Sequence, residues 1–262
     1  MLPFIKYQGT GNDFVMIDQR ESKFLSRTDH ERIARLCDRR FGVGADGLIL
    51  LENHVDYAFE MVYFNADGYQ SSMCGNGGRC IAHYAHALGV PGAHYRFLAI
   101  DGPHEAKVGE GNWVELKMSD VRELSSDNGQ YILDTGSPHY VTFVEDVSDI
   151  NVVESGQQIR YSKPFKEAGI NVNFVEMTDK GLRVATYERG VEAETLSCGT
   201  GVTAAALAFA VQRPEEREVY RVPIHAKGGS LEIRFRQLPD GAFTDIWLCG
   251  PATPVFVGEI SI

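Results

Sequence analysis

Two segments of this chain repeat one another, and each leads into a stretch that carries almost no charge. The first runs from Tyr63 to Gly77 and the second from Tyr187 to Gly201, and each places a Cys-Gly-x-Gly motif at the same distance after its tyrosine. Alanine-rich stretches follow at 76–88 and 200–212, and their composition predicts helices that are apolar nearly all round. Such a helix must be covered on most sides, so we expect each half of the chain to wrap a curved sheet around it.

The same order of predicted elements in both halves indicates the fold class. Strands, one apolar helix and further strands follow one another twice. We therefore predict an α/β protein of the α+β type with two pseudo-symmetric domains, each a curved, mostly antiparallel sheet around a central apolar helix. A loop-like stretch near 118–130 is the expected boundary, which gives an N-terminal half over 1–120 and a C-terminal half over 121–251. The last strand, 252–262, is expected to return to the first half.

The charge, the apolar runs and the cysteine count of the chain exclude several classes of function. A formal net charge of −11 leaves no basic footprint for a nucleic-acid partner, and Arg39-Arg40 is only a pair. No apolar run is long enough to cross a membrane, and the N-terminus shows no export pattern, so we expect a cytoplasmic protein without membrane association. Five scattered cysteines fit neither a disulfide framework nor a zinc site, so no metal is expected and a reducing compartment is indicated.

The repeated motif suggests acid/base chemistry. Cys74 and Cys198 each stand just before a predicted helix, where unpaired backbone N–H groups and the helix dipole lower a thiol pKa from its usual value of about 8.5. The same N–H groups can bind a carboxylate. Two opposed thiols could therefore invert a carbon centre, one removing a proton and the other returning one. The chain shows no phosphate-loop, dinucleotide-binding or pyridoxal-phosphate lysine motif, and this chemistry requires no cofactor.

A cysteine in a glycine-rich turn is more often structural than functional. That interpretation suits Cys37, Cys80 and Cys249, whose neighbours indicate core positions. The duplication favours a function for Cys74 and Cys198. An alternative of another class remains open at this point, namely a non-catalytic amino-acid-binding protein or a thiol redox sensor.

Eight ordered motifs, spread over nearly the whole chain, resemble the diaminopimelate epimerase family of cofactor-independent epimerases. They are Gly9–Phe14, Gly42–Gly47, Phe64–Gly68, Met73–Cys80, Ser137–His139, Asn171–Phe174, Tyr187–Gly190 and Ser197–Gly201. The resemblance implies an isomerase that interconverts L,L- and meso-diaminopimelate for lysine and, in many bacteria, cell-wall precursor synthesis, and it implies a homodimer. The alternative within the same architecture is a proline racemase or hydroxyproline epimerase.

The resemblance also implies a role for each matched position. Cys74 and Cys198 would be the catalytic pair, and His139 and Glu188 would tune their pKa values. Substrate would be bound by Asn12, Asn65, Gly75, Asn76, Asn171, Glu188, Arg189, Gly199 and Thr200. Arg189 would reach the distal carboxylate and Glu188 the distal ammonium group. Some members carry glutamine where Gly47 stands, and many carry Asn-Pro-His where this chain has Ser137-Pro138-His139. These two departures leave open which side chains of this chain contact the distal end of the substrate.

Overall fold

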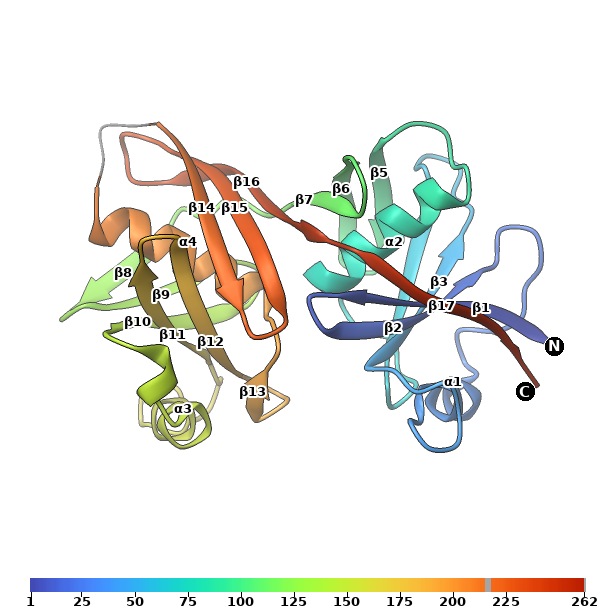
Figure 1. The fold of residues 1–262 in the computed structure, drawn as a ribbon, viewed down its shortest axis with the longest axis horizontal. Coiled ribbons are helices and arrows are strands. Elements are labelled where there is room, and N and C mark those ends of the chain that lie inside the picture. The colour runs from blue at the N-terminus through green and yellow to red at the C-terminus, as the bar shows by residue number, and fades with distance from the viewer. Residues whose placement is uncertain (215–217, 262) are drawn as a thin grey trace. The chain divides into compact units, whose positions relative to one another are not determined.

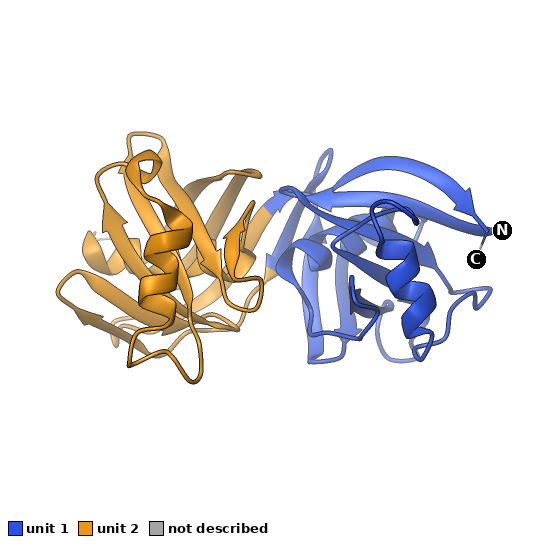
Figure 2. Cartoon of the chain, turned by 90° about the horizontal axis from the view of Figure 1, so that it is seen from below, with its two compact units in different colours: residues 1–116, 250–262 blue, residues 117–249 orange. Residues whose placement is uncertain are grey.

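The chain forms two compact units in a computed structural model that describes residues 1–214 and 218–261 (Figure 1). Unit 1 contains residues 1–116 and 250–262, and unit 2 contains residues 117–249 (Figure 2). The chain therefore leaves unit 1 at Leu116, builds unit 2, and returns to unit 1 with its last segment.

Unit 1 is a curved sheet with two helices. Its elements are β1 (Leu2–Gly9), β2 (Asn12–Asp18), α1 (His30–Cys37), β3 (Gly47–Glu52), β4 (Glu60–Asn65), α2 (Gly75–Ala87), β5 (His94–Ala99), β6 (Gly102–Val108), β7 (Trp113–Lys117) and β17 (Thr253–Ile260). The strands pair in the order β17-β1-β2-β3-β4-β5-β6-β7, and only β2–β3 and β4–β5 are parallel. Each parallel connection contains a helix, as parallel neighbours require a crossover.

Unit 2 repeats this plan. Its elements are β8 (Leu124–Asp127), β9 (Gln130–Asp134), β10 (Pro138–Val144), a 3₁₀ turn η1 (Val147–Asp149), α3 (Val152–Arg160), β11 (Asn171–Thr178), β12 (Gly181–Glu188), β13 (Ala193–Thr195), α4 (Gly199–Gln212), β14 (Val219–Ala226), β15 (Gly229–Gln237) and β16 (Phe243–Pro251). The order β8-β9-β10-β11-β12-β14-β15-β16 has the same succession of antiparallel and parallel neighbours, and β13 adds to β12. The two units are thus pseudo-symmetric, and the predicted fold class is confirmed.

The two motif helices lie inside their sheets. Helix α4 is buried nearly all round and contacts β9 to β12, β14 and β15, while α2 contacts β1 to β4 and β6. Glycine allows the close approach of α2 to its sheet, because a Cβ at Gly77 would lie 3.1 Å from Ile49 Cδ1 and 3.3 Å from Met61 Cε. The apolar composition of both helices follows from this cover.

The stretch expected to be a loop at 118–130 contains a hairpin instead. Strands β8 and β9 pair through Asn128 and Gly129, whose φ angles of 49° and 77° are those of a tight hairpin turn. Strand β8 is short and mostly exposed, so its serines and Asp127 have the composition of a loop and do not predict a strand. The sequence analysis also missed α3.

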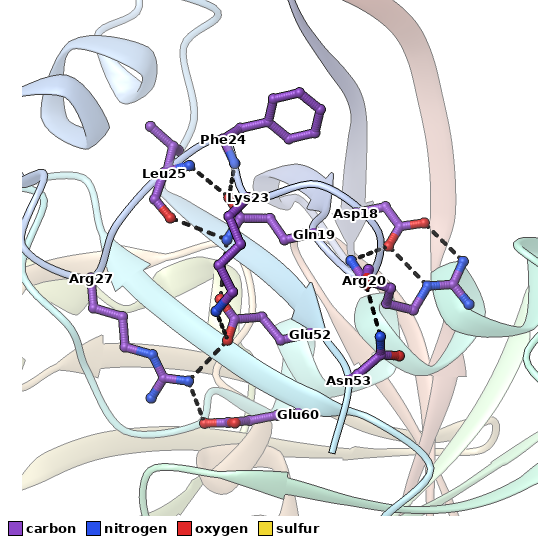
Figure 3. Close-up of polar contacts among 10 residues, drawn as sticks. All are labelled: Asp18, Gln19, Arg20, Lys23, Phe24, Leu25, Arg27, Glu52, Asn53 and Glu60. Atoms are coloured by element: carbon purple, nitrogen blue, oxygen red, sulfur yellow. Dashed lines mark hydrogen bonds and ion pairs between the residues drawn. The ribbon is translucent and has the colours of Figure 1, made fainter. Parts of the chain in front are cut away.

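A polar network fixes the segment between β2 and α1 (Figure 3). Gln19 is buried, and its Oε1 accepts hydrogen bonds from the backbone of Phe24 and Leu25 while its Nε2 donates to Glu52 Oε1. Glu52 also pairs with Arg27, which reaches Glu60 at 2.8 Å. The network joins this segment to β3, which pairs with β2, and to β4, which ends at Asn65.

Candidate active site

Cys74 lies at the start of α2 in unit 1. It is the N-cap residue with extended backbone angles, and its carbonyl accepts the first helical hydrogen bond from Gly78 N at 2.7 Å. The N–H groups of Gly75, Asn76 and Gly77 precede that bond and have no acceptor within the helix. No acidic residue stands in the first turn. This end of α2 is therefore suited to bind an anion beside the thiol.

The Asn12 side chain joins Cys74 to a network of charges. Asn12 Oδ1 accepts from Cys74 Sγ at 3.4 Å, and Asn12 Nδ2 donates to Asp46 Oδ2 at 2.7 Å. Arg39 bridges Asp46 and Asp13, at 2.7 and 2.8 Å. Burial alone would raise the pKa of Asp13, but hydrogen bonds from Arg39 and Lys6 outweigh it and hold this pKa well below its usual range. The network keeps Asn12 at the N-terminus of α2.

A buried arginine contacts Asn76 in the first turn of α2. Arg79 is fully buried, and its Nη2 donates to Asn76 Oδ1 at 3.0 Å and to Thr10 Oγ1 at 3.2 Å. Asn76 Nδ2 in turn donates to Asn12 Oδ1 at 3.3 Å. The side chain of Asn76 is thus hydrogen-bonded within unit 1. Its backbone N–H is the group that faces the N-terminal end of α2.

Cys198 has the matching position in unit 2. It is the N-cap of α4, with extended backbone angles, and its carbonyl accepts from Val202 N at 2.9 Å. Its Sγ lies 3.4 Å from Thr200 Oγ1, and Thr135 Oγ1 donates to the Thr200 carbonyl at 2.8 Å. Gly199, Thr200 and Gly201 supply the first-turn N–H groups of α4, which lie before the first hydrogen bond within the helix. The expected equivalence of the two cysteines is therefore present in the local backbone.

A buried polar cluster lies against the first turn of α4. A Cβ at Gly201 would lie only 2.4 Å from Asn173 Oδ1, which accepts from Thr186 Oγ1 at 2.9 Å. Asn173 Nδ2 donates to the Tyr140 carbonyl and to His139 Nδ1, at 3.0 and 3.1 Å. Sequence reasoning missed Asn173, although its alternation with Asn171 along β11 places both on one face.

His139 is neutral in this cluster. Its side chain is fully buried, and burial, followed by the positive charge of Arg189, lowers its pKa to about 3. Because Nδ1 accepts the hydrogen bond from Asn173, the proton of the neutral ring is on Nε2. Nε2 is buried and has no hydrogen-bond partner among the described residues. His139 can therefore donate a hydrogen bond but cannot serve as a cation at neutral pH.

Asn171 forms hydrogen bonds, within unit 2, to the residues around the expected distal end of the substrate. Its Nδ2 donates to Ser137 Oγ and to the Pro138 carbonyl, at 2.9 and 3.0 Å, and its Oδ1 accepts from Arg189 N at 2.9 Å. The Arg189 guanidinium donates to Ser137 Oγ at 3.4 Å and to the Ala168 carbonyl at 3.1 Å. Asn171 thereby holds the backbone of Arg189, and Ser137 supports its side chain. Glu188 is the last residue of β12, directly before Arg189.

The remaining predicted residue, Asn65, is exposed at the end of β4 and pairs in register with Gly47. A Cβ at Gly47 would lie 2.5 Å from both the Phe64 carbonyl oxygen and Tyr63 Cε2. The tyrosine ring thus occupies the space that a longer side chain at position 47 would need, which explains why glycine stands there.

The other cysteines have different environments. Burial raises the pKa of the Cys37 and Cys80 thiols to about 12, so both stay protonated at neutral pH. Cys249 is fully buried in β16. Among the described residues, no group of three or more His, Cys, Asp or Glu side chains is placed to hold a metal ion.

Comparison with known proteins identifies the family. The sequence matches the diaminopimelate epimerase family over residues 4–122 and 131–241. It is 48% identical to a diaminopimelate epimerase of Flavobacterium psychrophilum over 252 residues, which covers 96% of this chain and 97% of that protein. The chain belongs to the diaminopimelate epimerase family. The family assignment made from the eight motifs is therefore confirmed.

Solved structures outside this family share the fold. A phenazine biosynthesis protein of the PhzF family from Bacillus anthracis superposes with a TM-score of 0.79 at 12% identity, covering 100% of this chain and 99% of that one. A hydroxyproline epimerase from Agrobacterium vitis gives a TM-score of 0.69 at 13% identity, covering 99% and 90%. At such identities the likeness shows the epimerase fold alone. Within the described residues, no helix is both long and apolar enough to cross a bilayer.

Proposed function

We propose that the chain inverts the α-carbon of L,L-2,6-diaminopimelate to give meso-diaminopimelate, with Cys74 and Cys198 as the two acid/base groups. The observation that carries the proposal is the matched pair of cysteine N-caps on α2 and α4. One sulfur, as thiolate, takes the α-proton, and the other, as thiol, delivers a proton to the opposite face. Proton removal places negative charge on the α-carboxylate, and the first-turn N–H groups of the helices are suited to stabilise that charge.

The substrate assignment rests on the distal end. Diaminopimelate carries a second amino-acid group remote from the reacting carbon. We assign its carboxylate to Arg189, whose planar guanidinium suits a carboxylate, and its ammonium group to Glu188. A proline racemase or hydroxyproline epimerase would have no use for this charged pair, and the likeness to a hydroxyproline epimerase extends to the fold only. Asn12, Asn65, Asn171, Gly75, Asn76, Gly199 and Thr200 complete the proposed binding set.

Assembly and location form a further part of the proposal. The homodimer implied by the family is proposed to form through β17, which pairs with β1 along one edge and exposes Val255 and Val257 by 56% and 75%. A second copy could cover these side chains by strand pairing. None of the five cysteines forms a disulfide, which suits a reducing compartment and supports a cytoplasmic location.

Solvent deuterium tests the reaction. In D₂O with reductant, the protein should introduce deuterium at the α-carbon of L,L-diaminopimelate and form the meso isomer. Cys74→Ala and Cys198→Ala should abolish exchange, whereas the matched controls Cys37→Ala and Cys249→Ala should retain it. Near-normal turnover by either of the first two variants would refute the two-cysteine mechanism. Exchange into proline in place of diaminopimelate would favour the racemase alternative, and binding without exchange would favour a non-catalytic protein.

A further inference from the structure

A single glutamate closes the turn that begins at Arg189. Residues 189–192 connect β12 to β13, and Glu192 has a φ of 57°, in the left-handed region that side chains rarely adopt. Glu192 N donates to the Glu188 carbonyl at 2.8 Å, and Gly190 N donates to Glu192 Oε1 at 3.1 Å. A backbone conformation of this kind persists only where its surroundings hold it.

The carboxylate of Glu192 is held by three side chains from β12 and from the end of α3. Its Oε2 accepts from Tyr187 Oη at 2.8 Å and from Tyr161 Oη at 2.9 Å, and its Oε1 lies 3.5 Å from Arg160 Nε. Burial raises the pKa of Glu192, but hydrogen bonds from the Gly190 backbone and both tyrosines outweigh it and hold this pKa below its usual range. The carboxylate is therefore ionised at neutral pH, and each of these partners is a donor.

Helix α3 packs directly against β12, so it can support Glu192. A Cβ at Gly156 would lie 2.4 Å from Tyr187 Cβ, and glycine is therefore required for this close approach. Tyr187 is fully buried, whereas Tyr161 is 50% exposed at the C-cap of α3. The Arg160 guanidinium lies over the Tyr161 ring, with Cζ 4.8 Å from the ring centroid. The end of α3 thus presents Arg160 and Tyr161 together to the carboxylate.

Arg160 also connects Glu192 to the side chain of Arg189. The Nη1 atoms of the two arginines donate to backbone carbonyls of the segment 166–168, at 3.2 and 3.1 Å. A Cβ at Gly169 would lie 2.7 Å from Arg189 Cδ and 2.9 Å from Arg160 Cζ. The two arginines are therefore neighbours across Gly169, and the charge of Glu192 offsets the repulsion between them.

We propose that Glu192 is a positioning residue for substrate specificity, which holds Arg189 at the reach required by the distal carboxylate of diaminopimelate. It acts on the backbone beside Arg189 through Gly190 N and on the side chain through Arg160. The inference rests on the proposed function and adds the group that sets selectivity for a substrate with a distal carboxylate. Because that carboxylate is remote from the reacting carbon, its contact is the same in the ground state and the transition state. The loss of its positioning should therefore appear in KM and not in kcat.

A double-mutant cycle with L,L-diaminopimelate tests the proposal by steady-state kinetics. Glu192→Ala keeps a Cβ, and with it the backbone cost of the turn, and removes the carboxylate. It should raise KM about tenfold and change kcat by less than about twofold. In an Arg189→Ala background, the same substitution should change kcat/KM by less than about twofold, because Glu192 acts through Arg189. The matched control is Glu154→Ala, which removes an exposed glutamate from the other end of α3 and should leave KM unchanged.

Hydrogen exchange, measured by NMR on the substrate-free protein, gives a second readout. The Arg189 amide keeps its acceptor, Asn171 Oδ1, in Glu192→Ala, so faster exchange at this amide reports motion of the turn and not a lost acceptor. We expect the rate at Arg189 to rise about tenfold. A parent protein that fails to epimerise diaminopimelate would refute the proposed function, whereas unchanged exchange at Arg189 would refute the positioning role. The two failures are therefore distinguishable.

Two kinetic results would also overturn the inference. An unchanged KM in folded Glu192→Ala would remove Glu192 from specificity. An equal loss of kcat/KM in the parent and Arg189→Ala backgrounds would show that Glu192 supports the fold and does not act through Arg189. If thermal melting shows that Glu192→Ala does not fold, Tyr161→Phe removes one donor to the same carboxylate at a half-exposed position. It should raise KM about threefold, and an unchanged KM in this variant would be equally decisive.

Discussion

The neutral state of His139 makes unit 2 sensitive to mild acid. Burial holds the pKa of the folded histidine at about 3, while an unfolded histidine titrates at about 6.5. The stability that His139 contributes is therefore fully present above about pH 6.5 and is lost progressively as the pH falls toward 3. One pKa unit corresponds to about 1.4 kcal/mol, so lowering the pH from 7 to 5 should cost about 2 kcal/mol through this residue alone.

His139→Asn isolates this effect. Asparagine can still accept the hydrogen bond from Asn173 but has no proton to gain in this range. The free energy of unfolding is measured by urea titration at pH 7 and pH 5, in a Trp113→Phe background, so that fluorescence reports Trp247, which is buried in unit 2. The parent should lose about 2 kcal/mol more than the variant between the two pH values. An equal loss in both proteins would show that His139 is not held neutral by burial.

Three further predictions follow from particular contacts. Gly201→Ala should lower the free energy of unfolding by about 1–3 kcal/mol, because its Cβ would meet Asn173 Oδ1 at 2.4 Å, and an unchanged melting temperature would contradict the close approach. Arg189→Ala should reduce kcat/KM for L,L-diaminopimelate by about a hundredfold through the lost charged contact, and unaltered kinetics would exclude Arg189 from the site. Val257→Asp should convert a dimer into monomers in sedimentation experiments, and an unaltered dimer would place the interface elsewhere.

The elements with a clear periodic or repeated pattern could be predicted from the sequence. The two apolar helices and the long strands around them have unambiguous composition, and the duplicated motif located both cysteine N-caps. The short, exposed strand β8 could not be found in this way, because its serines and aspartate have the composition of a loop. Helix α3 buries only Val152 and Gly156, too few positions to give a helical pattern.

Most of the polar support of the site could not be predicted, for a different reason. Asp13, Arg39 and Asp46 come from a strand and a loop, and nothing in their spacing indicates that they meet around Asn12. The arginines near position 39 have the pattern of a solvated helix face, and Arg39 is indeed half exposed while it bridges two carboxylates. Asn173 could have been inferred from strand alternation only if the face of β11 toward α4 had been known.

Strand β17 has a consequence for how the protein is made. Its partner β1 precedes unit 2 in the chain, whereas β17 follows it, so β17 is synthesised only after β1 and all of unit 2. At typical translation speeds, the outer edge of β1 waits on the order of ten seconds for its neighbour. During that interval the nascent chain presents an unpaired strand, which is a template for pairing with other chains. Deletion of β17 would leave this edge of β1 permanently unpaired, and we expect it to lower the yield of soluble protein.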